Sequence, residues 1–400
     1  MTELHYRQWM GHIQRLPVCA LVTTGRTGSD FLQSLLDSHP QVLTFNGHFA
    51  VYTEFFKTSA CFKLKPVSAR DLVDEFVGRF IYKLVSRYDV QEGKDRLGDG
   101  CNRSFSIDTD MFRAHVVGLL GGLEVTSRDF LLAVYGAYNL CLGHELLAKR
   151  IAFHHPHLFY EFEEFVKDFP NTSVVVTTRD PRANFTSHVE HFRRYYENHD
   201  NQQHLYVSLK MMLEDSTPLE KTGLRYVAVR LEDLPKESTL KVLSHWLGIT
   251  YRDSLLRSTW AGLDWHGDSL SGRTFEPQGW SETRSENGWR QRLGRMEQYV
   301  FNYILQARLQ HYRYPYKKAR WWDSLLVPLL IPLPMKYERR YLSFRYYGHL
   351  SRKGASEFYK ELPLTPLFYF KRVVLCYKHY FRALLGSGFT GPWIDGAKPA

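Results

Sequence analysis

The stretch that decides the fold is residues 18–29, which reads VCALVTTGRTGS. Its first six residues are apolar or β-branched and predict a buried parallel strand. The glycine-containing turn Thr24–Ser29 follows. Phe31–Leu36 then repeats apolar residues at the spacing of one helix face, until His39 and Pro40 end the helix. This order of strand, glycine loop and helix predicts an α/β fold.

Further strands alternate with helices along the chain. Residues 41–45, 172–178 and 224–231 are strand candidates, and helices are expected to begin at Pro181 and to span residues 238–247. Such alternation is typical of a parallel sheet with helices on both faces.

Residues 50–148 are predicted to form a mainly helical insertion over the sheet. The sequences SARD (68–71) and TSRD (126–129) have the pattern of helix N-caps. We expect one domain, residues 1–316, that contains this insertion, followed by a distinct C-terminal region, residues 317–400.

The composition fits a globular protein. Hydrophobic residues make up 44% of the chain and charged residues 24%, which excludes disordered and fibrous classes. The longest apolar run, residues 325–334, contains three prolines and is shorter than the roughly 20 residues of a membrane span. Residues 1–17 have no apolar signal core. Five widely spaced cysteines without a CxxC pair predict a cytoplasmic, reducing location and no metal site.

The first glycine loop is a candidate anion site. Backbone N–H groups of residues 26–29 would converge at a helix N-terminus, which attracts phosphate, and Arg26 adds a positive charge. An ordinary tight turn would use the same residues. The nucleoside-triphosphatase form of such a loop is disfavoured because Asp30 stands where that motif has lysine.

A second candidate anion site follows the strand candidate 172–178. Arg179 stands at the carboxyl end of this strand, and Ser187 lies eight residues on, about two turns into the next helix. Both side chains can therefore face one anion at the rim of the sheet. The alternative is a helix start in which Arg179 only pairs with Asp180.

Together these segments resemble the sulfotransferases that use 3′-phosphoadenosine 5′-phosphosulfate. The matching stretches are TGRTGS (24–29) for the 5′-phosphosulfate loop, FLQSLLDSHP (31–40) for the next helix and turn, RDPR (179–182) with Ser187 for the 3′-phosphate motif, and VRLEDL (229–234) for the strand and turn that follow. The resemblance covers roughly residues 17–316. It implies a fold similar to that of P-loop proteins, sulfonate transfer to a hydroxyl group, this donor and no metal ion. The donor-binding residues it implies are Gly25, Arg26, Thr27, Gly28, Ser29, Arg179 and Ser187.

Three positions depart from the family pattern. Asp30 replaces the usual hydroxyl residue, and a carboxylate beside a polyanion is unfavourable unless it turns outward to cap the helix. Where many members have lysine two residues before a proline, this chain has HHP at 154–156, so Lys149 or His154 are possible substitutes. The C-terminal donors to the 3′-phosphate are matched only loosely, by Arg284 and Arg290.

Sulfonate transfer needs a base for the acceptor hydroxyl and positive charge beside the transferring group. His48 follows the strand candidate 41–45, on the sheet edge that carries the glycine loop, and an imidazole titrates near neutral pH. The resemblance implies a Glu or His base in this region, because family members often have Gly-Glu where this chain has Gly47-His48. We assign catalysis to His48 and Arg26, with Glu54 as the alternative base.

The last 84 residues, 317–400, are basic and aromatic. They hold 15 Lys and Arg against 5 Asp and Glu, whereas the residues before them hold 37 of each, so the whole formal charge of +10 lies in this segment. Seventeen of its residues are aromatic. Aromatic side chains beside cations suit an anionic membrane interface. The alternative is a helical subdomain that packs its aromatic side chains on the catalytic core.

The sequence therefore predicts a sulfotransferase that acts on a hydroxyl acceptor carried by a glycan, glycolipid or lipid-linked substrate. We expect peripheral attachment to an anionic membrane through residues 317–400 and no nucleic-acid partner. Two other functions stay open: a nucleotide-dependent kinase with a P-loop-like fold, and a non-catalytic protein that binds a nucleotide or lipid.

Overall fold

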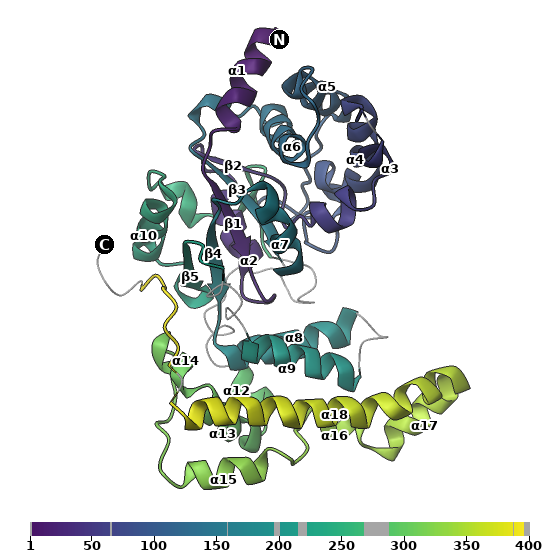
Figure 1. Cartoon of the computed structure of the whole chain (residues 1–400), viewed down its shortest axis with the longest axis vertical. Coiled ribbons are helices and arrows are strands. Elements are labelled where there is room, and N and C mark those ends of the chain that lie inside the picture. The colour runs from purple at the N-terminus through teal and green to yellow at the C-terminus, as the bar shows by residue number, and fades with distance from the viewer. Residues whose placement is uncertain are drawn as a thin grey trace. The chain divides into compact units, whose positions relative to one another are not determined.

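The computed structural model describes residues 2–64, 66–157, 159–195, 201–214, 222–267, 288–386 and 388–395. The chain divides into two compact units (Figure 1). Unit 1 comprises residues 1–177, 218–281 and 394–400, and unit 2 comprises residues 178–217 and 282–393. Most of the segment 317–400 therefore belongs to unit 2, together with residues from two earlier parts of the chain.

Unit 1 is built on a five-stranded sheet in the order β2-β3-β1-β4-β5. β1 pairs in parallel with β3 and with β4, and β3 pairs in parallel with β2. Four of the five residues of β1 are buried, as expected for a strand that is covered on both faces. The predicted α/β fold, a P-loop-like parallel sheet flanked by helices, is confirmed. The strands are β1 (Val18–Val22), β2 (Val42–Thr44), β3 (Ile151–His157), β4 (Ser173–Thr178) and β5 (Tyr226–Arg230).

Helices cover both sides of this sheet. Figure 1 shows the helices between β2 and β3 on one side and α10 on the other. Two of the insertion helices begin at the N-caps that the sequence predicts, because Ser68 accepts a hydrogen bond from the Asp71 N–H and Thr126 from the Asp129 N–H. The helices of unit 1 are α1 (Glu3–Ile13), α2 (Ser29–Leu36), the π-helix η1 (Tyr52–Phe56), α3 (Ala60–Lys63), α4 (Ala69–Leu84), α5 (Thr109–Leu120), α6 (Ser127–Cys141), α7 (Phe159–Asp168) and α10 (Glu237–Leu247).

Two smaller features complete unit 1. The short strands β6 (Thr259–Trp260) and β7 (Leu263–Asp264) form an antiparallel pair. At the end of the chain, the N–H of Ile394 donates to the carbonyl of Ala228 in β5 (2.9 Å). Ile394 thus joins the strand at the edge of the sheet.

The sequence did not predict β3, which lies between β1 and β2 in the sheet. Its sequence, IAFHHPH, breaks the apolar run with His154, His155 and Pro156. All three of these residues are nevertheless buried. The sheet pairing of a central strand decides the conformation here, and local propensity does not.

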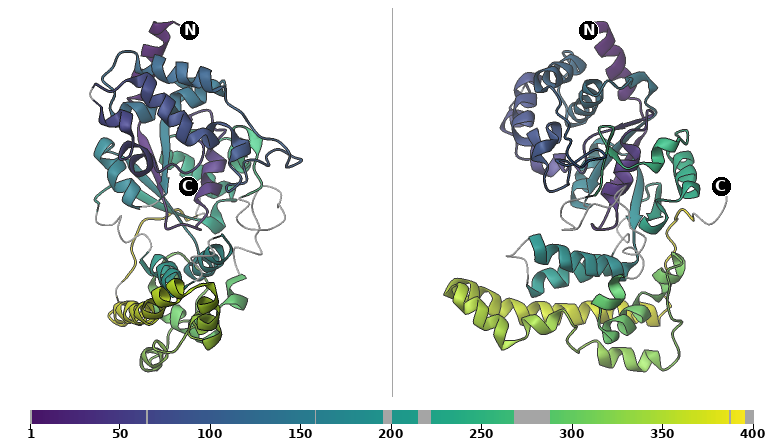
Figure 2. Two further views of the ribbon diagram at one scale, coloured as in Figure 1. Left: turned by 90° about the vertical axis from the view of Figure 1, so that its right-hand side faces the viewer. Right: turned by 180° about the vertical axis from the view of Figure 1, so that it is seen from behind.

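Unit 2 is helical in the residues that the structure describes. A long C-terminal helix, α18, packs against α9, α13, α15 and α17, and Figure 2 shows this group from two further sides. The helices are α8 (Pro181–Tyr195), α9 (Gln202–Glu214), α12 (Gly288–Arg292), α13 (Arg295–Ile304), α14 (Gln306–His311), α15 (Asp323–Leu330), α16 (Glu338–Tyr341), α17 (Phe344–Lys353) and α18 (Ala355–Leu384).

Gly28 lies where the first glycine loop makes close contact with the turn after β5. It is the N-cap of α2 with a φ of 87°, and a Cβ at this position would lie closer than 3.0 Å to Leu231 Cδ1. Leu231 belongs to the VRLEDL stretch. Only glycine satisfies both the left-handed backbone and the close approach.

We predict that Gly28→Ala lowers the free energy of unfolding more than Gly248→Ala does. Gly248 also has a positive φ, 72°, but a Cβ there meets nothing within 4 Å. Both variants carry the left-handed penalty of about 1–2 kcal/mol, and only Gly28→Ala adds an overpacking cost of about 1–3 kcal/mol. Urea unfolding of the two variants measures this difference, and equal losses would contradict the close-approach argument.

Candidate functional site

The loop Thr24–Ser29 links the carboxyl end of β1 to the first turn of α2. Three of its residues have a left-handed backbone: Gly25 (φ 85°), Arg26 (φ 54°) and Gly28 (φ 87°). The N–H groups of a helix's first turn have no acceptor inside that helix, and the helix dipole places positive charge there. The loop geometry therefore favours an anion at the start of α2, beside the Arg26 guanidinium.

Buried hydroxyl groups hold this loop against the sheet. The Thr27 hydroxyl hydrogen-bonds the hydroxyl of Thr177 in β4 (2.8 Å) and that of Thr23, which in turn accepts from the Gly25 N–H (3.0 Å). The Thr27 side chain thus binds the neighbouring strand, so any contact of Thr27 with an anion would come from its backbone N–H.

Arg179 and Ser187 belong to unit 2. Arg179 directly follows β4, and Ser187 lies in α8; both side chains are half-buried. Both carboxylate oxygens of Asp180 accept hydrogen bonds from the Arg182 guanidinium (2.9 and 2.7 Å), and Oδ1 also accepts from the Arg182 N–H. The buried Asp180–Arg182 pair therefore fixes the first turn of α8 directly after Arg179.

His48 lies at the carboxyl edge of the sheet in unit 1. The next residue, Phe49, donates its N–H to the carbonyl of His155 in β3 (2.8 Å), and this bond places His48 beside the end of that strand. The His48 ring is 5.1 Å from that of His157 and 6.1 Å from that of His155. Since the His48 side chain is 38% exposed, a substrate can reach it.

A carboxylate from the helical insertion faces His48. Glu92 Oε1 lies 3.5 Å from His48 Nδ1, a long hydrogen bond, and 3.6 Å from Lys83 Nζ, while Oε2 pairs with Lys94 Nζ. Burial by itself raises the pKa of the Glu92 carboxyl, but Lys83 and Lys94 outweigh it and hold this pKa well below its usual range. Glu92 is thus an anion that accepts a hydrogen bond from His48.

The two lysines of this cluster are themselves buried. Lys83 is 1% exposed and Lys94 is fully buried, where its Nζ lies 3.9 Å from the centre of the Trp260 ring. Desolvating such ammonium groups costs several kcal/mol each unless they are paired. A Cβ on Gly47 would lie within 3.0 Å of Lys94 Nζ, so this glycine leaves room for the cluster.

A second row of polar groups connects α2 to β3. His155 Nδ1 hydrogen-bonds Gln33 Oε1 (2.7 Å) and lies 3.8 Å from Asp30 Oδ1, and its Nε2 is 3.4 Å from His157 Nδ1. Burial lowers the pKa of His155 well below its usual value, and the neighbouring His157 and His48 lower it further. Asp30 therefore faces the buried imidazole of His155 in β3. From the sequence it was open whether Asp30 turns outward to cap α2.

The chain is similar to known proteins in two comparisons. A model of the sulfotransferase family matches residues 17–253, more than half of the chain. The chain belongs to the sulfotransferase family. A search of curated proteins found no match. Among solved structures, a sulfotransferase domain from the olefin synthase of Synechococcus PCC 7002 is similar at 14% identity and a TM-score of 0.38, covering 68% of this chain and 87% of that domain.

In this sulfotransferase, the other candidate bases have different surroundings. Glu54 is exposed on η1, and in the described residues no hydrogen bond joins its carboxylate to His48 or Glu92. His154 points to the opposite face of β3, where its Nδ1 hydrogen-bonds the Tyr135 hydroxyl (2.6 Å) and its ring stacks on Phe165. Burial lowers the pKa of His154 to about 3, which fits a neutral core side chain.

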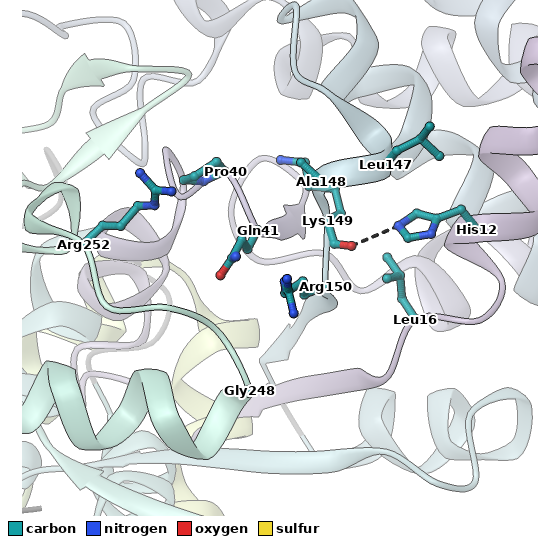
Figure 3. Close-up of a pocket in the computed structure, with 10 residues that line it drawn as sticks. All are labelled: His12, Leu16, Pro40, Gln41, Leu147, Ala148, Lys149, Arg150, Gly248 and Arg252. Atoms are coloured by element: carbon teal, nitrogen blue, oxygen red, sulfur yellow. Dashed lines mark hydrogen bonds between the residues drawn. The ribbon is translucent and has the colours of Figure 1, made fainter.

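Lys149 lies at the other edge of the sheet. Its Nζ donates to the carbonyl of Val42, the first residue of β2, and burial lowers its pKa to about 8. Lys149 lines a hollow of about 590 Å³. Figure 3 shows its carbonyl hydrogen-bonded to His12 there. Because the strands are parallel, this amino edge is opposite the glycine loop, and Lys149 does not substitute for a lysine there.

The remaining candidates are in unit 2. Arg290 is exposed on the short helix α12, and Arg284 lies outside the described residues. In the part of the chain that the structure describes, no group of three or more His, Cys, Asp or Glu side chains is arranged to hold a metal ion.

The sequence alone did not predict the charged cluster beside His48, which comes from the insertion between β2 and β3 and consists of Glu92, Lys83 and Lys94. No motif in the sequence marks them, since they are charged residues in helical and loop segments that read as solvated surface. A signal was present in β3, where the run HHPH places two imidazoles at the carboxyl end of a strand.

We predict that Glu92→Gln lowers the free energy of unfolding at pH 7 by about 3 kcal/mol or more, because the buried Lys83 loses the carboxylate it pairs with and the buried Lys94 keeps only Asp89, at 3.6 Å. The folded pKa of Glu92 is depressed, so its contribution is present above the unfolded-state value of about 4.3 and is lost as the pH falls through the folded value. The gap between wild type and variant should therefore shrink below about pH 4.

Urea unfolding across pH 3–7 tests this linkage. Glu164→Gln is the matched control, because Glu164 pairs on the surface with Lys57 and Lys167. It should change stability little. Equal stability of Glu92→Gln and wild type at pH 7 would show that the cluster is not held together by charge.

Proposed function

We propose that this sulfotransferase transfers the sulfonate group of 3′-phosphoadenosine 5′-phosphosulfate to a hydroxyl group of a glycan, glycolipid or lipid-linked acceptor, with His48 as the base. The observation that carries the proposal is the position of the anion-favouring loop and of the half-exposed His48 at the same carboxyl edge of the sheet. In α/β sheets, ligands bind at this edge.

The residues of the loop fit the 5′-phosphosulfate of the donor. Two left-handed glycines and the start of α2 form an anion-binding turn, and Arg26 adds charge beside it. The donor, when bound, supplies the sulfuryl group that is transferred. Arg26 and the loop N–H groups would stabilise charge on the transferring oxygens, which is electrostatic catalysis without a metal ion.

The proposed role of His48 is to take the proton of the acceptor hydroxyl at Nε2. The anionic Glu92 accepts the hydrogen bond of Nδ1–H and so favours the tautomer whose Nε2 carries a free electron pair. Glu92 also favours the imidazolium that forms when the proton arrives. Lys83 and Lys94 keep Glu92 ionised for this purpose, which makes Glu92 a positioning residue.

We expect the bisphosphate product of the donor to raise the melting temperature of the protein, and ATP with magnesium to leave it unchanged. Arg179→Ala should weaken binding of the bisphosphate about 10- to 150-fold, because one charged hydrogen bond contributes about 1.5–3 kcal/mol. Ser187→Ala should have a smaller effect. Calorimetric titration measures both, and stabilisation by ATP with magnesium instead would favour a kinase.

We expect His48→Ala to lower turnover about 10²- to 10⁴-fold with the affinity for the bisphosphate nearly unchanged, because proton transfer matters only in the transition state. Glu54→Gln should have a mild effect. The assay uses donor labelled in the sulfonate group and a panel of glycan and glycolipid acceptors, which also identifies the acceptor. A severe loss in Glu54→Gln with a mild loss in His48→Ala would transfer the role to Glu54.

A further inference from the structure

Helix α18 in unit 2 presents its apolar side chains to the outside. Eight large apolar side chains along it are exposed, among them Phe370 (64%) and Leu385 (81%). At 100° per residue these positions fall within an arc of about 140°, which is one continuous face of the helix. The eight residues are Tyr359, Leu362, Leu367, Phe370, Val374, Phe381, Leu384 and Leu385.

The opposite face of α18 is buried and carries charge. Arg372 Nη2 pairs with Glu338 Oε2 of α16 (2.8 Å), and Gln202 of α9 donates to Glu338 Oε1 (2.6 Å). Glu361 and His379 are buried on the same side. The buried side of α18 thus combines these polar groups with Leu375 and Cys376. Much of the helix's apolar surface is nevertheless exposed, whereas an ordinary surface helix buries its apolar face.

A second helix continues the exposed apolar face. α15 lies beside α18, where the hydroxyls of Tyr377 and Tyr380 donate to the carbonyls of Pro328 and Ser324 (Figure 1). The outward side chains of α15 and its flanks are Trp321, Trp322, Leu325, Leu326, Leu329 and Leu333, all exposed. We call the exposed apolar side chains of α15 and α18, with these flanks, the apolar face of unit 2.

Exposed cations lie along one margin of this face, and one of them, Lys378, pairs with Glu214 of α9 (2.9 Å). Four exposed cations on α18, Lys360, Lys371, Lys378 and Arg382, follow one margin of the apolar arc within about 40° of helix rotation. Three of the segment's five acidic residues, Asp323, Glu338 and Glu361, are buried. The burial of these acids leaves the surface of the segment more positive than its composition alone suggests.

We propose that the apolar face of unit 2 binds the surface of a membrane that contains anionic lipids. No helix in the described ranges is both long and apolar enough to cross a membrane. Large exposed apolar patches on a protein surface mark sites of interaction with proteins or membranes. Aromatic and aliphatic side chains with cations along one margin match the boundary between acyl chains and anionic headgroups.

Co-sedimentation of the full-length protein with vesicles tests this proposal. Vesicles of phosphatidylcholine with phosphatidylserine should bind the protein more tightly than vesicles of phosphatidylcholine alone, and rising salt should remove the difference. Replacing Lys360, Lys371 and Arg382 by glutamine should weaken binding to the anionic vesicles about 100-fold, since each cation near such a surface contributes about a factor of five.

Two matched controls separate this face from general charge and hydrophobicity. Lys63→Gln, Arg70→Gln and Arg252→Gln remove the same charge from exposed positions of unit 1 and should leave vesicle binding unchanged. Leu325→Ser, Leu329→Ser, Phe370→Ser and Val374→Ser should abolish binding to both kinds of vesicle. Leu4→Ser, Tyr88→Ser, Val90→Ser and Leu123→Ser in unit 1 should not.

Every substituted side chain is exposed, so we expect all the variants to fold. Circular dichroism and the melting temperature check this expectation. Sedimentation velocity of the protein without vesicles tests the other occupant, a second copy of this chain. A dimer that dissociates in the serine variant of the apolar face, or vesicle binding that the controls weaken equally, would overturn the proposal. Because donor binding is measured separately, either result leaves the proposed transferase activity untouched.

Discussion

The close contact between Gly28 and Leu231 is the interaction on which unit 1 and its candidate site depend. It joins the loop after the central strand β1 to the turn after the edge strand β5, and no side chain fits between them. The hydroxyl contacts of Thr27 with Thr23 and Thr177 hold the same loop to β4. The loop amides are thereby fixed before any ligand arrives, which is the condition for electrostatic stabilisation without reorganisation.

The local part of this arrangement could be read from the sequence. Strand β1, the glycine loop and α2 follow from short-range patterns, and the N-caps Ser68 and Thr126 are set by side chains within one turn. β3 could not be read, because its histidines and proline are tolerated only by pairing with β1 and β2 on either side. Glu92 could not be read either, since its neighbours in space, His48 and Lys83, are brought to it by the folding of the insertion.

The candidate site in unit 1 therefore has two origins. The sheet edge supplies the anion-favouring loop and the imidazoles of His48, His155 and His157, while the insertion supplies the carboxylate of Glu92 beside His48 and the lysines that keep it ionised. Such a division lets the residues of the insertion vary without altering the loop. The short motifs quoted above include the glycine loop but none of the insertion residues, which are brought together from positions far apart in the chain.

The discontinuity of unit 2 has a consequence for the order of events during synthesis. α8 and α9 leave the ribosome early, yet α9 packs on α18, which begins about 140 residues after α9 ends. At about 5–20 residues per second, α9 waits roughly 7–28 s for this partner. The edge strand β5 likewise receives Ile394 only after residue 394 has been synthesised. Helices α8 and α9 thus spend this interval without their final packing partner, which makes them the segment of the nascent chain that a chaperone would protect.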